Sequence, residues 1–263
     1  MSKETIRGVP ETMLQTLYAR ARETQTGRGY IRDEKAVEIV AAMDYDFSSA
    51  HQDKAMSTGV VARTILLDRM VEEFLRAHPG TTVVNIACGL DTRCYRMAGL
   101  FAQWYNLDLP ETMDIRRRFL QESDTVHQIA CSAMNAQWTQ AVPATDGPVL
   151  VIIEGLTMYL KEADVQQLFS ILSKKFHSLT VFVEVMSPWV AGHVKEKSIE
   201  GSSAKFTWGV RSGSELAALV PPFRSLGEHS LTEGMSVFLP IYKVLGKIPC
   251  VRNISNKILV LEK

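Results

Sequence analysis

The sequence predicts an α/β fold, in which a doubly wound, mostly parallel sheet of about seven strands follows an N-terminal extension of helices. Three observations predict it. Helical and strand-like periods alternate along the chain after about residue 80. Mostly helical periods fill the 80 residues before them. The first strand is a continuous apolar run that ends in Ala87-Cys88-Gly89, whose small residues suit a central strand entering a tight turn.

Three amphipathic helices are expected in the N-terminal extension. The first covers Pro10 to Arg22, and Gly27-Arg28-Gly29-Tyr30 breaks it. The second opens at Asp33-Glu34-Lys35-Ala36. The third covers about Thr58 to Ala77 and ends before His78-Pro79-Gly80. We therefore expect residues 1–80 to form a helical extension or lid, and residues 81–263 to form the domain that contains the sheet.

The second part of the chain holds seven candidate strands and four candidate helices. The strands are Thr82 to Ala87, Gln103 to Leu107, His127 to Cys131, Val149 to Ile153, Thr180 to Val185, about Arg224 to Ser230, and Lys257 to Leu261. The helices lie near Thr92 to Phe101, Glu111 to Glu122, Lys161 to Phe176, and Gly213 to Val220. Ser187 to Trp208 and Thr232 to Asn256 interrupt the alternation. Because both follow strands, we expect them to form lids over the carboxyl edge of the sheet.

The composition favours a globular protein with a small-molecule partner. A chain of 263 residues that is 46% hydrophobic supports a sizeable core. Lys and Arg together number 29, as do Asp and Glu, so no basic field indicates nucleic acid. The charged start Met1 to Arg7 lacks an apolar leader, and the run Val149 to Ile153 is too short to span a bilayer. We expect no membrane partner and a cytoplasmic location; no feature of the sequence specifies an oligomeric state.

Cysteine and histidine spacing argues against a metal site. The four cysteines form no C-x-x-C pair, and the six histidines form no H-x-x-H or H-E-x-x-H set. We therefore predict no bound metal, and free, mostly buried thiols in a reducing compartment.

The first two strands carry a nucleotide-binding pattern. Gly89 and Asp108 are 19 positions apart, the spacing at which the acid that ends a second strand reaches ribose hydroxyls. This favours an adenosine ligand. The turn offers one glycine where a dinucleotide fingerprint has three, and no P-loop lysine follows. A nicotinamide-dependent oxidoreductase is thus suggested only by the spacing of the acid.

Several motifs in the same order resemble a known family. They are Arg63-Thr64 with Leu67-Asp68, Asn85 to Arg93 with Tyr95-Arg96, Asn106 to Pro110, Arg116 to Arg118, Glu154 to Leu160, and Trp208-Gly209. The sequence resembles the leucine carboxyl methyltransferase superfamily, and within it the bacterial O-methyltransferases that act on small molecules and polyketides. The resemblance implies a Rossmann-like class I methyltransferase fold with an antiparallel last strand, and S-adenosylmethionine as cofactor.

The resemblance also implies which residues bind this cofactor. Arg63, and by looser alignment Arg22, match basic positions that hold the methionine carboxylate, as a guanidinium fork suits. Exposed helix arginines are the alternative for both. Asp108 would accept from the ribose hydroxyls, or would only cap the next helix. The remaining positions that the resemblance assigns to the cofactor are Ala87, Gly89, Leu109, Ser132, Ala133 and Glu154.

Two departures from the family pattern leave other functions open. Ala87 replaces the first turn glycine, and Ser132 stands near the position where many members have an aspartate that reads adenine. A cofactor-independent cyclase or dehydratase on the same scaffold is therefore one alternative. The superfamily also contains enzymes that methylate a protein C-terminus, and a pseudoenzyme that binds a protein partner is a further possibility.

The expected reaction makes few chemical demands on the protein. Displacement at a sulfonium releases a neutral thioether, so the protein mainly aligns and desolvates the reactants. An ionised carboxylate acceptor needs no general base, whereas a phenol or alcohol would gain from one. The candidates for a catalytic group are Tyr159 and His193, with His51 as a further one and Tyr30 at the methionine end. An ordinary structural role is the alternative for each.

The predicted lids favour an apolar, aromatic acceptor through their large side chains. These are Met186, Trp189, Phe206, Trp208, Met235 and Phe238.

Overall fold

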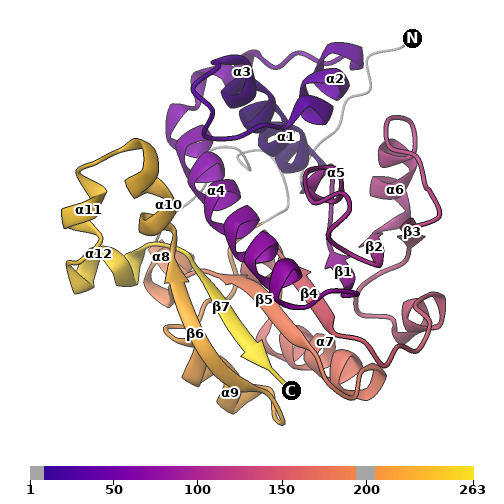
Figure 1. Cartoon of the computed structure of the whole chain (residues 1–263). Helices are drawn as coiled ribbons and strands as arrows, with labels where there is room; N and C mark the ends of the chain where they lie inside the picture. The colour runs from indigo at the N-terminus through magenta and orange to yellow at the C-terminus, as the bar shows by residue number, and fades with distance from the viewer. Residues whose placement is uncertain (1–8, 194–204) are drawn as a thin grey trace.

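The computed structural model describes residues 9–193 and 205–263, which form one α/β unit around a seven-stranded sheet (Figure 1). The strand order is β3-β2-β1-β4-β5-β7-β6. β7 runs antiparallel to both of its neighbours, and the other strands share one direction. The strands are β1 (Thr82–Ile86), β2 (Gln103–Asp108), β3 (Val126–Ala130), β4 (Val149–Ile153), β5 (Thr180–Val185), β6 (Arg224–Ser230) and β7 (Lys257–Glu262).

The strand order places a crevice near the middle of the sheet. From β1 the chain moves outward through β2 and β3, then returns to lay β4 on the other side of β1. Loops that leave neighbouring strands in opposite directions open a space at the strands' carboxyl ends. The predicted turn after β1 and Glu154 after β4 both lie at this switch point.

Helices cover both faces of the sheet, because its central strands are buried on both sides (Figure 1). On one face α4 (Lys54–Ala77) packs Leu66 and Met70 against Val83 of β1. On the other face α7 (Glu162–Lys175) and α9 (Gly213–Leu219) pack against a cluster that includes Val84. Successive residues of β1 thus point to opposite cores, as strand geometry requires.

The first helices lie over the end of the sheet where β1 turns. α1 (Val9–Gln25) and α2 (Glu34–Ala42) share a third cluster with Leu90 of the turn and Leu120. The other short elements are α3 (Ser48–Gln52), α5 (Arg93–Arg96), α6 (Pro110–Arg116), η1 (Ala136–Ala141), η2 (Thr157–Tyr159), α8 (Pro188–His193), α10 (Leu231–Phe238), α11 (Tyr242–Leu245) and α12 (Pro249–Ile254). None of the helices within the described ranges is long and apolar enough to cross a membrane.

The seven predicted strands are confirmed, and their ends move by one residue at most. The helices differ more. α4 begins earlier than predicted because the Asp53 side chain accepts from the Met56 N–H and caps it there. The helix predicted from Thr92 to Phe101 is only α5, and the chain turns at Gly99 in the left-handed region with φ of 82°. α6 is likewise shorter than predicted and ends at Arg116.

Candidate active site

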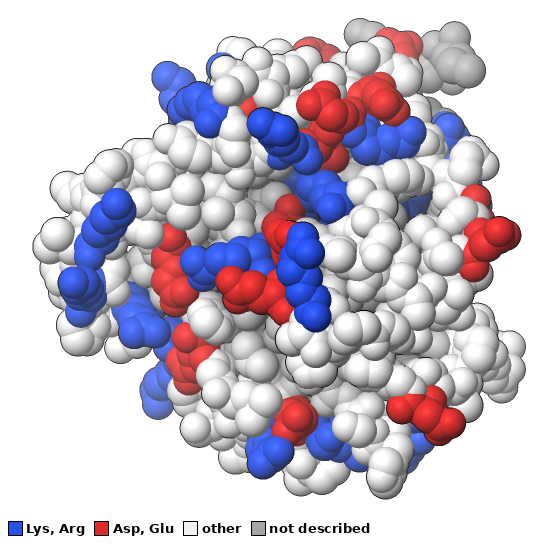
Figure 2. Space-filling view, in the orientation of Figure 1, with Lys and Arg blue, Asp and Glu red and all other residues white. Residues whose placement is uncertain are grey.

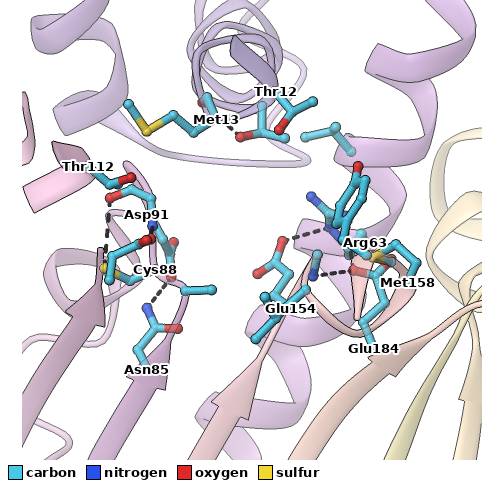
Figure 3. A pocket seen from close by; sticks show the side chains of 18 of the residues that line it. Thr12, Met13, Arg63, Asn85, Cys88, Asp91, Thr112, Glu154, Met158 and Glu184 are labelled. Atoms are coloured by element: carbon cyan, nitrogen blue, oxygen red, sulfur yellow. Dashed lines mark hydrogen bonds and ion pairs between the residues drawn. The ribbon is translucent and has the colours of Figure 1, made fainter. Parts of the chain in front are cut away.

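A cavity of about 580 Å³ lies at the carboxyl ends of the parallel strands, between α1 and α4 (Figure 3). Its size is within the range of roughly 300–1,000 Å³ that is usual for small-molecule sites. Figure 3 shows two facing walls with Thr12 and Met13 of α1 above them. Asn85, Cys88, Asp91 and Thr112 form one wall, and Arg63, Glu154, Met158 and Glu184 form the other.

The turn after β1 shapes the first wall. Ala87 and Gly89 both have left-handed backbone, with φ of 54° and 48°. Glycine adopts this region freely, whereas an L-residue such as alanine loses about 1–2 kcal/mol there. The Gly89 N–H donates to Asp108 Oδ2, and the Leu109 N–H donates to Asp108 Oδ1, each at 2.7 Å. Burial raises the pKa of Asp108, although these N–H groups act in the opposite direction.

Arg63 of α4 holds two carboxylates on the second wall. Its Nη1 donates to Oε2 of Glu184 at 3.0 Å, and its Nε lies 2.6 Å from Oε1 of Glu154. The Nε contact lacks hydrogen-bond geometry, so this buried N–H has no hydrogen-bond partner among the described residues. Burial alone would lower the pKa of Arg63, but Glu184 and Glu154 outweigh it and raise the pKa above its ordinary value.

Glu184 is fixed by three donors. Besides Arg63, the Gly155 N–H donates to Oε2 at 2.8 Å and Asn256 Nδ2 donates to Oε1 at 2.9 Å. The carboxylate is almost fully buried near the end of β5. A buried charge needs such partners, since a lost partner leaves it without compensation.

Arg93 links the two walls from below. It donates to Asp91 at 2.7 Å, to Glu154 at 2.9 Å and to Asp68 at 2.7 Å. Burial alone would raise the pKa of Asp91 and of Glu154, but neighbouring guanidinium groups outweigh it and lower both. These carboxylates therefore stay ionised and already paired.

Asp33 connects the N-terminal helices to this network. Its Oδ2 accepts from Arg20 at 2.9 Å, from Arg96 at 2.8 Å and from the Thr92 hydroxyl at 2.6 Å. Its Oδ1 accepts from the Ala36 N–H and so caps α2. Burial alone would raise the pKa of Asp33, but Arg20 and Arg96 outweigh it and lower the pKa. One buried carboxylate thus ties α1, α2 and α5 together.

Most of the residues predicted to bind the cofactor line this cavity. They are Arg63, Ala87, Gly89, Asp108, Leu109, Ser132, Ala133 and Glu154. Arg63 is mostly buried there, and not an exposed helix arginine. Arg22 does not line the cavity: α1 turns Thr16 and Arg20 toward it, and at 100° per residue Arg22 faces elsewhere. There its Nη1 lies 2.8 Å from Nδ1 of His51.

The candidate catalytic residues are divided between the cavity and the surface. Tyr159 lines the cavity. His193, His51 and Tyr30 do not line it. The His193 ring stacks on Trp189 within α8, with its Nδ1 2.9 Å from the Trp189 carbonyl oxygen. The Tyr30 ring packs against Phe238.

Among the described residues, the two predicted lid segments contribute three residues to the cavity lining. Val190 and Phe206 come from the first segment, whose residues 194–204 lie outside the described ranges, and Asn256 comes from the second. Glu184, Asn85 and Arg20 were not predicted to line the site. Glu184 lies within the otherwise apolar strand β5, where a carboxylate needs a partner, so this pattern could have indicated it. Within the same ranges no cluster of His, Cys, Asp or Glu suits a metal ion.

Comparison with known proteins identifies the family. A family model described as leucine carboxyl methyltransferase matches residues 13–173. The chain belongs to this family. It is 33% identical over 251 residues to the tetracenomycin polyketide synthesis O-methyltransferase TcmP of Streptomyces glaucescens, covering 92% of each chain. It is 30% identical to the S-adenosyl-L-methionine-dependent methyltransferase dpfgK of Gibberella zeae, covering 83% of this chain and 81% of that protein.

The fold agrees with this leucine carboxyl methyltransferase assignment. The magnesium protoporphyrin IX methyltransferase of Synechocystis superimposes with a TM-score of 0.52 at 11% identity, over 80% of this chain and 88% of that one. The sheet order and the antiparallel β7 are those expected of a class I methyltransferase. The chain is thus an S-adenosylmethionine-dependent methyltransferase, and the family assignment disfavours the oxidoreductase reading.

Proposed function

We propose that this enzyme methylates an oxygen of a small, largely apolar acceptor, either a carboxylate or an acidic hydroxyl, as in polyketide-like natural products. The proposal rests mainly on how the acidic side chains that line the cavity are paired and ionised. Asp91 and Glu154 are paired with arginines that lower their pKa values, so they are weak bases. Burial raises the pKa of Asp108, but both of its oxygens already accept hydrogen bonds from backbone N–H groups. No histidine is among the described residues that line the cavity. An acceptor that is already ionised suits such a site.

The cavity fits the donor that the family uses. S-adenosylmethionine supplies an electrophilic methyl group on a sulfonium, next to an amino-acid group and an adenosine. Asp108 would hold the ribose hydroxyls, with Ala87 and Gly89 beneath the ligand. Arg63 lines the cavity, and a carboxylate is a ligand group that a guanidinium binds well. Glu154, beside it, offers an acceptor for the amino group.

Apolar side chains support the acceptor class. Five methionines and one phenylalanine line the cavity: Met13, Met56, Met134, Met158, Met186 and Phe206. Methionine is flexible and polarisable, so it packs well against rings of different shape. A polyketide O-methyltransferase among the relatives agrees with this class. Methylation of a protein C-terminus is the alternative, and no structural feature favours it over a small acceptor.

The donor site is tested by calorimetric titration with S-adenosylhomocysteine. Two variants are compared, each of which replaces one arginine by lysine. Arg63→Lys should weaken binding at least ten-fold, because lysine lacks the bidentate fork. Arg22→Lys, outside the cavity, should bind as the wild type does. Absence of binding at millimolar ligand by folded protein, or loss of binding in the Arg22 variant alone, would contradict the assignment.

The acceptor class is tested with a labelled donor and a panel of aromatic acids, phenols and the matching primary amides. We expect methyl esters or ethers from the acids and phenols and no product from the amides. For carboxylate acceptors the rate should be nearly constant from about pH 6 to 9, since such an acceptor is ionised throughout. Methylation at carbon or nitrogen alone would overturn the proposal.

A further inference from the structure

The chain between α10 and β7 carries an exposed apolar surface. Residues 239–256, which contain α11 and α12, are here called the α11–α12 lobe. Ile241 is 62% exposed and Val244 is 67% exposed. Single exposed aliphatic residues are ordinary, but several in one short segment mark an interaction surface. The exposed aliphatic side chains of the lobe are Leu239, Ile241, Val244, Ile248 and Ile254.

The same lobe is positively charged. Lys243, Lys247 and Arg252 are exposed, and none forms an ion pair with another described residue. No Asp or Glu occurs between Glu233 and Glu262, although the whole chain has a formal net charge of zero. Figure 2 shows blue side chains on an otherwise white surface over α11 and α12.

The lobe projects from the edge of the molecule but is firmly attached. Figure 1 places α11 and α12 at the outer side, beyond α10. The Leu231 N–H donates to the Asn256 carbonyl at 3.0 Å and so closes the base of the segment. Leu231 and Asn256 both line the cavity. The base of the lobe therefore adjoins the active-site cavity.

We propose that the α11–α12 lobe docks on an anionic membrane surface. Exposed aliphatic tips among lysines and an arginine match the way peripheral proteins insert apolar groups between anionic headgroups. A second copy of the chain fits poorly, because a two-fold contact would bring the same three cations together. A protein partner also fits less well, since protein interfaces are depleted in lysine and depend mainly on aromatic anchors.

A membrane contact at the lobe departs from the absence of a membrane partner that the sequence led us to expect, since that expectation was based only on segments long enough to span a bilayer. A surface contact needs no such segment and uses a few side chains on short helices. An apolar acceptor that partitions into lipid would then reach the cavity from the adjacent membrane.

Co-sedimentation with lipid vesicles tests the proposal on the full chain. Vesicles of phosphatidylglycerol and phosphatidylcholine should bind the wild type, and vesicles of phosphatidylcholine alone should bind it much less. The double variant Lys243→Gln with Lys247→Gln should bind about 25-fold more weakly, from about five-fold per basic residue. Ile241→Ser with Val244→Ser should weaken binding at least ten-fold, because the apolar tips no longer insert.

Matched variants on other parts of the surface provide the controls. Lys35→Gln with Lys174→Gln removes the same charge from α2 and α7 and should leave binding unchanged. Leu226→Ser removes an aliphatic side chain that is 53% exposed on β6, also without effect. No binding to anionic vesicles, or equal losses in lobe and control variants, would overturn the proposal. So would a dimer, measured by light scattering, that only the Ile241 and Val244 variant dissociates.

Discussion

Arg63 and Glu184 are 121 residues apart in the chain, yet Nη1 of the arginine donates to Oε2 of the glutamate at 3.0 Å. The pair joins α4 to β5 along one wall of the cavity. Because Glu184 also accepts from Gly155 and Asn256, it positions the loop after β4 and the end of the α11–α12 lobe around the same guanidinium.

Replacing Glu184 by Gln should reduce the free energy of unfolding by about 1–3 kcal/mol, because Arg63 loses one of its two charged partners in a buried site. Urea denaturation measures the loss. The control is Glu38→Gln, which alters an exposed pair with Lys35 and should change stability by less than about 0.5 kcal/mol. Equal losses of stability in the two variants would show that the buried ion pair stabilises the fold no more than the exposed pair does.

Ala87→Gly should leave the protein as stable as the wild type or up to about 1 kcal/mol more stable. Glycine removes the strain at φ of 54°, and its greater freedom in the unfolded chain offsets part of the gain. Ala217→Gly in α9 provides the comparison and should cost roughly 1 kcal/mol, since that alanine has ordinary helical backbone. Thermal melts of both variants measure the difference. A loss of stability in Ala87→Gly as large as that in Ala217→Gly would show that the backbone of Ala87 is not strained.

Stability should fall on acidification. The pKa values of Glu154, Asp33 and Asp91 lie below their ordinary values of 4.5 and 3.8, so their stabilisation is complete above those values. It is lost as the pH falls through the lower values of the folded state. Asp108, whose pKa is raised, acts in the opposite sense, and its contribution is lost as the pH rises through its folded-state pKa.

Urea midpoints from pH 7 to pH 3 measure this dependence. The midpoint should begin to fall near pH 4.5, and Asp91→Asn should give a lower midpoint at pH 7 with a shallower fall. A midpoint that rises below pH 4.5 would mean that Asp108 outweighs the three paired acids.

Two helical glycines should respond to alanine in opposite ways. A Cβ at Gly234 of α10 would lie 2.0 Å from the Ala62 carbonyl oxygen of α4, so Gly234→Ala should cost 2 kcal/mol or more, roughly the scale of an overpacked core. A Cβ at Gly59 of α4 meets no atom within 4 Å, so Gly59→Ala should stabilise by roughly 0.5–1 kcal/mol. Chemical denaturation of both variants tests whether α10 packs closely on α4.

The strands were predictable because burial leaves a direct trace in the sequence. The run Val149 to Ile153 is wholly apolar because both of its faces are covered, and its bounds are the observed ones. Helix lengths were less predictable, because α5 ends at Arg96, shortly before the turn at Gly99, and not where its apolar pattern ends. The buried arginine network likewise leaves no local pattern, since Asp33 and Arg96 meet only in the folded chain.

Residues that belong to one local motif could be assigned to the cavity from the sequence, whereas residues far apart in the chain could not. Asp108 and Gly89 belong to one βαβ unit, so their spacing predicted that both would lie at one ligand site, and both line the cavity. Arg22 was placed by a loose alignment, and a shift of two residues on α1 moves a side chain to another face of the helix, so that Arg20 and not Arg22 lines the cavity. Glu184 stands out as a carboxylate within an apolar strand, but its partner Arg63 could not be recognised from the sequence because it precedes Glu184 by almost half of the chain.

The hydrogen bond between the Leu231 N–H and the Asn256 carbonyl brings the two ends of a 24-residue excursion together. Strands β6 and β7 pair directly below that junction, from Ser230 opposite Lys257 onward. The two ends of the excursion are therefore fixed to each other, so the length of the α11–α12 lobe can vary among relatives without changing the register of the hairpin that carries it. Natural divergence and deliberate grafting are both expected to be tolerated best at this junction.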